Sequence, residues 1–201
     1  EMLGVSMWLG GLGAPPVREA LARLAEASRQ MGEGMGRLAQ AGAELTARHG
    51  CPDALGGFGK APFDTVADTL RGTRGALLDL YRHPDKLLAA SAALVPSSID
   101  MAVGQASPAA PPLVVMPLHK GACGFMSFKQ FQKFYWPSLQ RVLEGIIAAG
   151  MVPYLFVEGT YDEPRLAHIA ASGLPAGCTV WAFDRTDMKQ VRKHFGGFAC
   201  F

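Results

Sequence analysis

Short apolar runs alternate with longer amphipathic segments from residue 54 onward. The runs are the expected strands, and they cover residues 54–58, 113–118, 151–157, 178–183 and 197–201. The segments between them are long enough for helices. This alternation predicts βα units that build a parallel sheet, which is the α/β fold class.

Residues 15–49 place Val, Leu and Met at roughly helical spacing. Gly32, Gly34 and Gly36 weaken the middle of this segment, because glycine is about 1 kcal/mol less favourable than alanine inside a helix. We therefore expect two helices, or one broken helix.

Residues 127–149 show the clearest helical pattern. Ser127 is the expected N-cap, and Pro137 predicts a kink or a boundary within the segment. The expected buried stripe consists of Phe131, Phe134, Tyr135, Leu139, Val142 and Ile146.

A chain of 201 residues suits one domain, with a helical part at 1–50 and βα units at 54–201. Hydrophobic residues make up 49% of the chain, yet no apolar run reaches the ~18 to 20 residues of a membrane span. The longest apolar stretch, 146–157, is interrupted by Gly150 and Pro153. We expect no membrane partner.

The 19 basic and 17 acidic residues are dispersed along the chain, which argues against a nucleic-acid partner. The cysteines lie far apart, without a C-x-x-C pair, and the chain shows no signal peptide. Reduced thiols in the cytoplasm are therefore expected.

Several blocks of sequence follow the order found in one known superfamily. Residues 59–65 read Gly-Lys-Ala-Pro-Phe-Asp-Thr, residues 70–72 read Leu-Arg-Gly, and a helical segment opens with His-Pro-Asp at 83–85. This order resembles the uroporphyrinogen decarboxylase superfamily, whose members carry G-x-P-[FW]-T, then L-x-G, then a helix opening with D-P-[ED]. Later blocks continue the resemblance at residues 124–139, 153–159 and 182–187.

The resemblance implies most of a (β/α)₈ TIM barrel, incomplete at both ends, with the N-terminal helices packed over one side. In such a barrel the reacting groups project from the C-terminal ends of the strands. The catalytic candidates at these positions are Glu158, His119 and Asp184. The substrate-binding candidates are Asp68, Arg71, Lys120, Tyr154 and Phe156. Because side chains alternate along a strand, Tyr154, Phe156 and Glu158 share one face.

Some candidates also fit structural roles. Glu158 could form a salt bridge, and His119 and Lys120 could be ordinary loop residues. The other histidines are expected at the surface, in helices or at their ends: His49, His83, His168 and His194.

Two acidic candidates have specific alternatives. Asp184 could be the N-cap of a helix that begins at Arg185. Asp68 could pair with Arg71 on one helix face.

The cobamide-dependent methyltransferases of the superfamily hold zinc with H-x-C and a distant cysteine, and the zinc activates a thiol that accepts a methyl group from a methyl-corrinoid. This chain has Phe156 and Glu158 in place of H-x-C. Glutamate can ligate zinc, and His119 on the neighbouring strand could supply a nitrogen. The resemblance thus implies zinc and a corrinoid as cofactors and a corrinoid protein as a partner. The positions of Glu158 and His119 make them the candidate metal ligands.

The decarboxylases of the superfamily act on a tetrapyrrole and need no cofactor. They carry a tyrosine where this chain has Asp68 and a serine where it has Gly121. These departures favour methyl transfer to a thiol, with uroporphyrinogen III decarboxylase as the alternative. A third interpretation is a non-catalytic partial barrel whose exposed sheet edges associate with a second copy, as a homo-oligomer, or with a missing segment.

Overall fold

A computed structural model describes residues 10–50, 56–104 and 112–201. The chain forms two compact units, Glu1–Asp53 and Ala54–Phe201. The expectation of a single partial-barrel domain over the whole chain stays a prediction.

The first unit consists of a short 3₁₀ turn, η1 (Gly11–Gly13), and the helix α2 (Pro15–His49). α2 is one continuous helix of 35 residues, so the expected break is wrong. Glycine weakens a helix but keeps its N–H group, whereas proline removes a bond from the i→i−4 ladder. The helix ends at Gly50, whose φ of 66° is left-handed and whose N–H donates to the carbonyl of Thr46.

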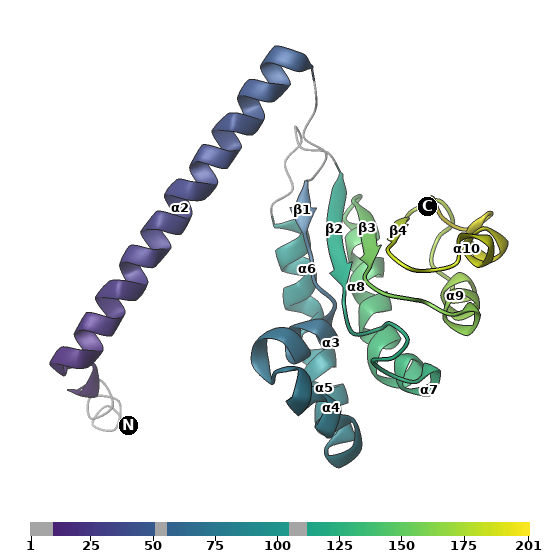
Figure 1. Ribbon diagram of the computed structural model, residues 1–201, viewed down its shortest axis with the longest axis horizontal. Coiled ribbons are helices and arrows are strands. Elements are labelled where there is room, and N and C mark those ends of the chain that lie inside the picture. The colour runs from purple at the N-terminus through teal and green to yellow at the C-terminus, as the bar shows by residue number, and fades with distance from the viewer. Residues whose placement is uncertain (1–9, 51–55, 105–111) are drawn as a thin grey trace. The chain divides into compact units, whose positions relative to one another are not determined.

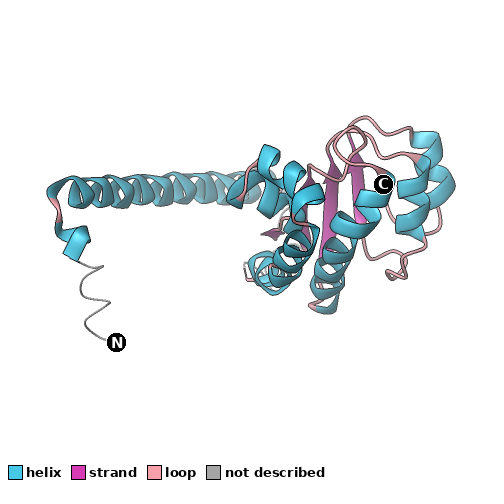
Figure 2. Ribbon diagram, turned by 90° about the horizontal axis from the view of Figure 1, so that it is seen from below, coloured by secondary structure: helices cyan, strands magenta, loops and turns pink. Residues whose placement is uncertain are grey.

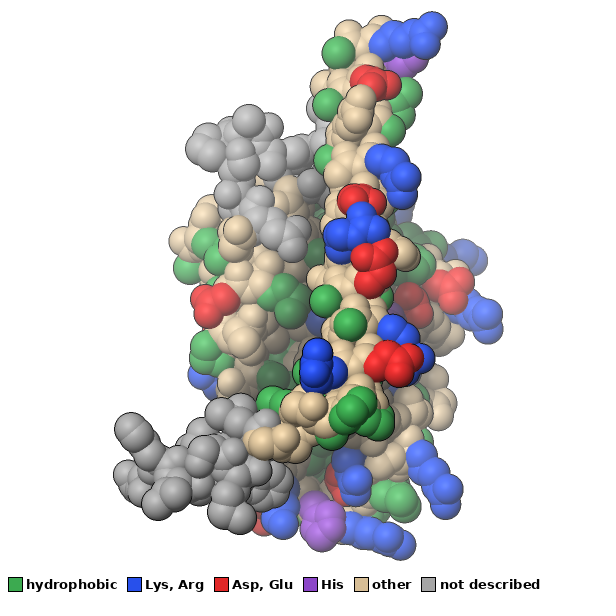
Figure 3. Space-filling view, turned by 90° about the vertical axis from the view of Figure 1, so that its left-hand side faces the viewer, with side chains coloured by type: hydrophobic (Ala, Val, Ile, Leu, Met, Phe, Trp, Pro, Cys, Tyr) green, Lys and Arg blue, Asp and Glu red, His purple; other side chains and the backbone are tan. Residues whose placement is uncertain are grey.

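Acidic and basic side chains interleave along α2 (Figure 3). Arg29 forms ion pairs with Glu26 and Glu33, and Arg23 lies 3.9 Å from Glu19. The large apolar side chains of the helix are between 46% and 70% exposed, and they are Leu21, Leu24, Met31, Met35, Leu38 and Leu45.

The second unit is built on a parallel four-stranded sheet in the order β1-β2-β3-β4 (Figure 1). The strands are β1 (Gly57–Phe58), β2 (Leu113–Leu118), β3 (Val152–Val157) and β4 (Val180–Phe183). Consecutive strands are neighbours, as in successive βα units of a barrel. The predicted parallel α/β sheet is confirmed.

Helices connect the strands. Between β1 and β2 lie α3 (Pro62–Thr65), the π-helical segment η2 (Val66–Leu70), α4 (Thr73–Arg82), α5 (Pro84–Ala93) and α6 (Val95–Val103). Between β2 and β3 lie α7 (Phe128–Gln130), the π-helical segment η3 (Phe131–Tyr135) and α8 (Trp136–Ala148). α9 (Glu163–Ala170) precedes β4, and α10 (Met188–Phe195) follows it.

The outer strands are shorter than predicted. Residues 54 and 55 of the first expected strand lie outside the described residues. The fifth expected strand, 197–201, is reduced to one parallel bridge between Val180 and Cys200. The Trp181 N–H donates to the Cys200 carbonyl, so this segment pairs with β4 over too few residues to count as a strand.

The helical pattern at 127–149 is confirmed, with a boundary inside it. Ser127 forms a capping box with Gln130, and Pro137 stands in the first turn of α8, directly after the π-helical segment. Proline is tolerated there because first-turn N–H groups have no intrahelical partner. Every residue of the expected stripe is buried.

The two faces of the sheet differ. Met116, Leu118, Leu155 and Val157 are fully buried, and α6 and α8 pack on this side of the sheet (Figures 1 and 2). The alternate residues point to the other face, where Phe156 is 37% exposed. This alternation confirms that Tyr154, Phe156 and Glu158 share a face.

Helices α5 and α6 together form an apolar stretch of 20 residues, Pro84–Val103, with a mean hydropathy of 1.3. By length and composition alone this stretch could cross a membrane, and in the described residues it is the one stretch that could. The expectation that no apolar stretch reaches this length is therefore wrong. Leu87, Val95 and Ala102 pack into the core, and 28% of the stretch is buried.

Candidate functional site

Charged side chains from several elements meet at the C-terminal edge of the sheet. Lys60 follows β1, His119 and Lys120 follow β2, Glu158 follows β3, and Asp68 lies in η2. We name these five residues the edge cluster. In parallel sheets with helical crossovers, this edge is where reacting groups gather.

Asp68 is the centre of the edge cluster. Its carboxylate lies 3.0 Å from the Lys60 Nζ, 3.1 Å from the Lys120 Nζ and 2.7 Å from the His119 Nδ1. Burial alone would raise the pKa of Asp68, but hydrogen bonds from His119, Lys60 and Lys120 outweigh it and lower the pKa to about 2. Asp68 is therefore ionised at neutral pH.

The ionised Asp68 fixes the protonation of the His119 ring. A carboxylate can only accept a hydrogen bond, so the Nδ1 atom must carry the proton. The Nε2 atom then faces Glu158, with 3.4 Å between Nε2 and Oε1. The imidazole stands between two carboxylates, one of which orients it.

Asp64 holds the main chain of the same two residues. Its carboxylate accepts the N–H groups of His119 at 3.0 Å and Lys120 at 2.9 Å, and the Tyr135 hydroxyl at 2.7 Å. It is fully buried, and burial raises its pKa, although these three hydrogen bonds partly oppose the rise. Asp64 and Asp68 are one helical turn apart, so one helical face fixes both the backbone and the side chains of the dipeptide.

Arg165 anchors the loop that follows the His119–Lys120 dipeptide after β2. This buried side chain donates to the Gly121 carbonyl at 2.9 Å and contacts the Cys123 Sγ at 3.2 Å. A Cβ added to Gly121 would lie 2.5 Å from the Tyr161 Oη. Atoms of the Tyr135 ring would lie 2.7 and 2.9 Å away, so the loop accepts no larger residue at 121 unless both tyrosines move.

The structure brings together four of the predicted site residues: Asp68, His119, Lys120 and Glu158. The predicted Asp68–Arg71 pair is wrong, because Arg71 pairs with Asp79 at 2.8 Å.

Three other predicted residues lie beside the edge cluster. Tyr154 and Phe156 lie on the open face of the sheet that leads up to it. Asp184 lies 3.2 Å from Arg185, and it is not the N-cap of the next helix. Asp187 caps α10 instead, because the helix begins at Met188.

Strand-end position also selects Asp64 as a residue to examine, but sequence reasoning gave it no role in the site and did not assign Lys60 to the site. Lys60 directly follows β1, and the four-residue spacing of Asp64 and Asp68 places both on one helical face. Those two signals could have found them.

Two histidines expected at the surface are partly buried. His168 packs edge-on against Phe131 and Trp136, and burial lowers its pKa. His194 lies 3.2 Å from Glu163. Neither belongs to the edge cluster.

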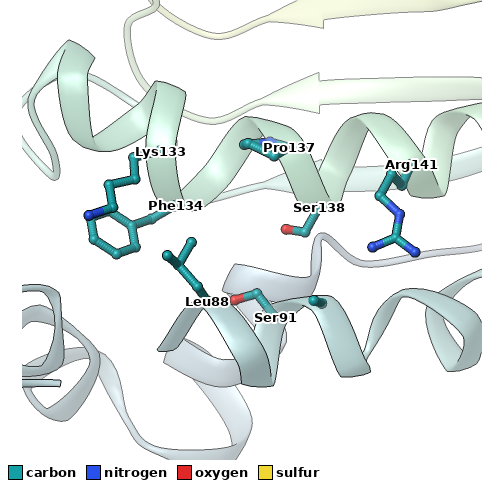
Figure 4. A pocket seen from close by; sticks show the side chains of 8 residues that line it. Leu88, Ser91, Lys133, Phe134, Pro137, Ser138 and Arg141 are labelled. Carbon is teal, nitrogen blue, oxygen red and sulfur yellow. The ribbon is translucent and has the colours of Figure 1, made fainter. Parts of the chain in front are cut away.

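A separate cavity of about 200 Å³ lies between α5 and α8 (Figure 4). Leu88, Phe134 and Pro137 form its apolar walls, and Lys133 and Arg141 lie toward its two ends. No residue of the edge cluster lines this cavity, so the cavity and the site are separate features.

A family model described as "Uroporphyrinogen decarboxylase (URO-D)" matches residues 1–200. The chain belongs to the URO-D family. Members of this family are generally enzymes with a TIM-barrel fold, and the four parallel βα units are those of a partial barrel. Searches of curated proteins and of solved structures returned no match. The cytoplasmic location stays a prediction.

The low pKa of Asp68 predicts a pH-dependent stability. Its folded pKa of about 2 lies below the ordinary 3.8, so the ionised form stabilises the fold at pH values above about 4. That contribution, about 2 kcal/mol, is lost as the pH falls from about 4 to about 2. The free energies of unfolding of wild type and Asp68→Asn, measured in urea, should therefore converge over this range. Asp100→Asn, an exposed control, should show no such convergence.

Asp64→Asn should release the backbone of the dipeptide. An amide has one acceptor oxygen, so either the His119 or the Lys120 N–H loses its partner, at a cost of about 1–3 kcal/mol. We expect faster hydrogen exchange at these two amides, measured by NMR. Tyr135→Phe removes only the hydroxyl bond and should leave both amides protected; equal exchange in the two variants would contradict the assignment.

Proposed function

We propose that this URO-D family chain binds a carboxylate-bearing tetrapyrrole at the edge cluster and transfers a proton to it through His119, in a carboxy-lyase reaction. The observation that carries the proposal is the chain of groups Asp68–His119–Glu158. Asp68 orients the imidazole by its Nδ1, which leaves Nε2 free to exchange a proton.

The charges suit an anionic substrate. Lys60 and Lys120 share the single carboxylate of Asp68, so these three groups together carry one positive charge that can pair with a substrate carboxylate. The charge of Glu158 is balanced when the neighbouring His119 is protonated. Both ammonium groups are only about one-fifth exposed. Partial burial strengthens such ion pairs relative to those in open water.

The open face of the sheet suits a flat apolar ring. Phe58 and Phe156 are 44% and 37% exposed there, and Val115 and Tyr154 pair in register between their strands. Aromatic side chains offer a large apolar contact area to a macrocycle. The aromatic face would hold the ring while the lysines hold its carboxylates.

The chemistry required of the protein is proton transfer. When the bond from carbon to a carboxylate breaks and CO₂ leaves, the electron pair stays on that carbon, which must receive a proton. A protonated His119 can donate it through Nε2, and Glu158 beside Nε2 stabilises the protonated ring. General acid catalysis of this kind contributes typically 10²–10⁴-fold.

An assay of the full chain with uroporphyrinogen, in which turnover and binding are measured separately, tests this proposal. His119→Gln should reduce turnover by about 10²-fold or more with little loss of affinity, and Lys60→Ala should weaken binding about tenfold. His83→Gln, at the end of α4, is the matched control. Unchanged turnover in His119→Gln, or no binding by wild type, would overturn the proposal; the second outcome would favour the non-catalytic partial barrel.

Methyl transfer to a thiol is a second candidate. The 3.4 Å between the His119 Nε2 and the Glu158 Oε1 is close to the roughly 3.3 Å between ligands in a tetrahedral site with zinc bonds near 2.0 Å. Asp68 on the other ring nitrogen is the usual outer partner of a metal-bound histidine. However, the described residues hold no group of three or more His, Cys, Asp or Glu side chains arranged for a metal, so they do not complete a zinc site. The corrinoid and its carrier protein stay predictions.

Zinc titration separates the two candidates. If the second is correct, the full chain binds one zinc per chain, and both Glu158→Gln and His119→Gln weaken that binding at least tenfold. Asp184→Asn should leave it unchanged. Absence of stoichiometric zinc, measured by elemental analysis after dialysis, would exclude the zinc-dependent candidate.

A further inference from the structure

The apolar residues of α2 follow a heptad repeat. The positions of this repeat are spaced alternately by three and four residues. Apolar side chains occupy seven of them, Val17, Leu21, Leu24, Met31, Met35, Leu38 and Leu45, and Ser28 and Gly42 occupy the other two. An average spacing of 3.5 residues keeps one seam of a helix facing another helix over its whole length. Packing of the helix against a sheet or a loop would not require an average spacing of 3.5 residues.

The positions on both sides of this seam are small and uncharged through the middle of the helix. They are Ala25, Gly32 and Ala39 on one side and Ala27, Gly34 and Ala41 on the other. Between residues 20 and 46 the charged side chains all lie on the remaining positions of the repeat. More than half of the circumference can therefore come close to a partner helix without burying a charge.

The glycines of α2 have no packing explanation within the described residues of their own unit. A Cβ added to Gly32, Gly34 or Gly42 would meet nothing within 4 Å, yet each glycine costs about 1 kcal/mol relative to alanine. They leave two hollows in the helix surface, one around Gly34 and one around Gly42, each lined only by α2 residues. Such hollows are holes into which side chains of another helix can pack.

We propose that α2 pairs with α2 of a second copy of the chain, in an antiparallel coiled coil. The seam runs from Val17 to Leu45, which is 29 residues of the 35-residue helix, or about 43 Å at 1.5 Å per residue. The longest helix described in the second unit has 13 residues, and its apolar face is buried in the core. A second α2 matches the seam in length and period. Five arginines against four glutamates give each copy a charge of only +1, so repulsion between them is small.

The antiparallel direction follows from side-chain size. With the two-fold axis at Glu33, Ser28 faces Leu38 of the second copy, and Gly42 faces its Leu24. Each small residue then meets a large one, which fills the holes. A parallel pair would instead place Gly42 against Gly42 and leave a cavity. Each exposed large side chain contributes roughly 100 Å², so the pair buries roughly 1,200 Å² or more, enough for a specific interface.

Sedimentation equilibrium of the full chain tests the pairing. Wild type should form a dimer, and Leu24→Ala combined with Leu38→Ala should weaken dimerisation at least tenfold. Gly34→Ala and Gly36→Ala form a matched pair, because alanine favours the helix equally at both positions, but only Gly34 flanks the seam. We expect Gly34→Ala to weaken the dimer and Gly36→Ala to leave it unchanged or tighter.

Three results would overturn the proposal. A monomer at all concentrations would show that α2 does not pair with itself. If that monomer also lost thermal stability when Leu24→Ala was combined with Leu38→Ala, the apolar seam would pack within one chain. A dimer that no α2 variant weakens would use another surface. Spin labels on Arg18→Cys, with the native cysteines replaced by alanine, should lie about 45 Å apart along the axis if the pair is antiparallel; a separation near 10 Å would exclude that direction.

Discussion

Two carboxylates one helical turn apart hold the same dipeptide, and the arrangement of the site depends on this double attachment. Asp64 accepts the main-chain N–H groups of His119 and Lys120, while Asp68 binds their side chains. The helical segment after β1 is thereby joined to the end of β2. Because Asp64 fixes the backbone of the dipeptide and Asp68 fixes its side chains, the His119 ring has one orientation, with Nε2 toward Glu158. The chemistry we propose needs that orientation.

The same residue type behaves differently at the two positions because the partners differ. Asp64 is fully buried and accepts only neutral donors, so desolvation dominates and raises its pKa. Asp68 is partly exposed and meets two ammonium groups and an imidazole, so its pKa is lowered. The first carboxylate therefore organises the backbone, and the second anchors charges that a substrate can share. If Asp64 and Asp68 exchanged roles, Lys60 and Lys120 would have to move as well, because both pair with Asp68.

The sequence predicted most of the sheet and the central part of the site. Strand-end position was enough to select His119, Lys120 and Glu158, because parallel strands end at a common edge. It was not enough for Arg71 or Asp184, because Arg71 reaches Asp79 in the next helix and Asp184 pairs with its own neighbour Arg185. The continuity of α2 was missed because glycine propensity was weighed above an intact hydrogen-bond ladder.

Glycines in the two units lead to different conclusions. Gly121 is explained by its own chain, because Tyr135 and Tyr161 occupy the space that a side chain would need. Gly34 and Gly42 have no such neighbour among the described residues of their own unit. In a helix interior, glycine is the least favourable residue after proline. A destabilising residue in or beside a heptad seam calls for a compensating contact, and the described residues of the first unit do not supply one. Close approach of a second helix would supply it, so the glycines that weaken α2 alone are the residues that would let two copies pack.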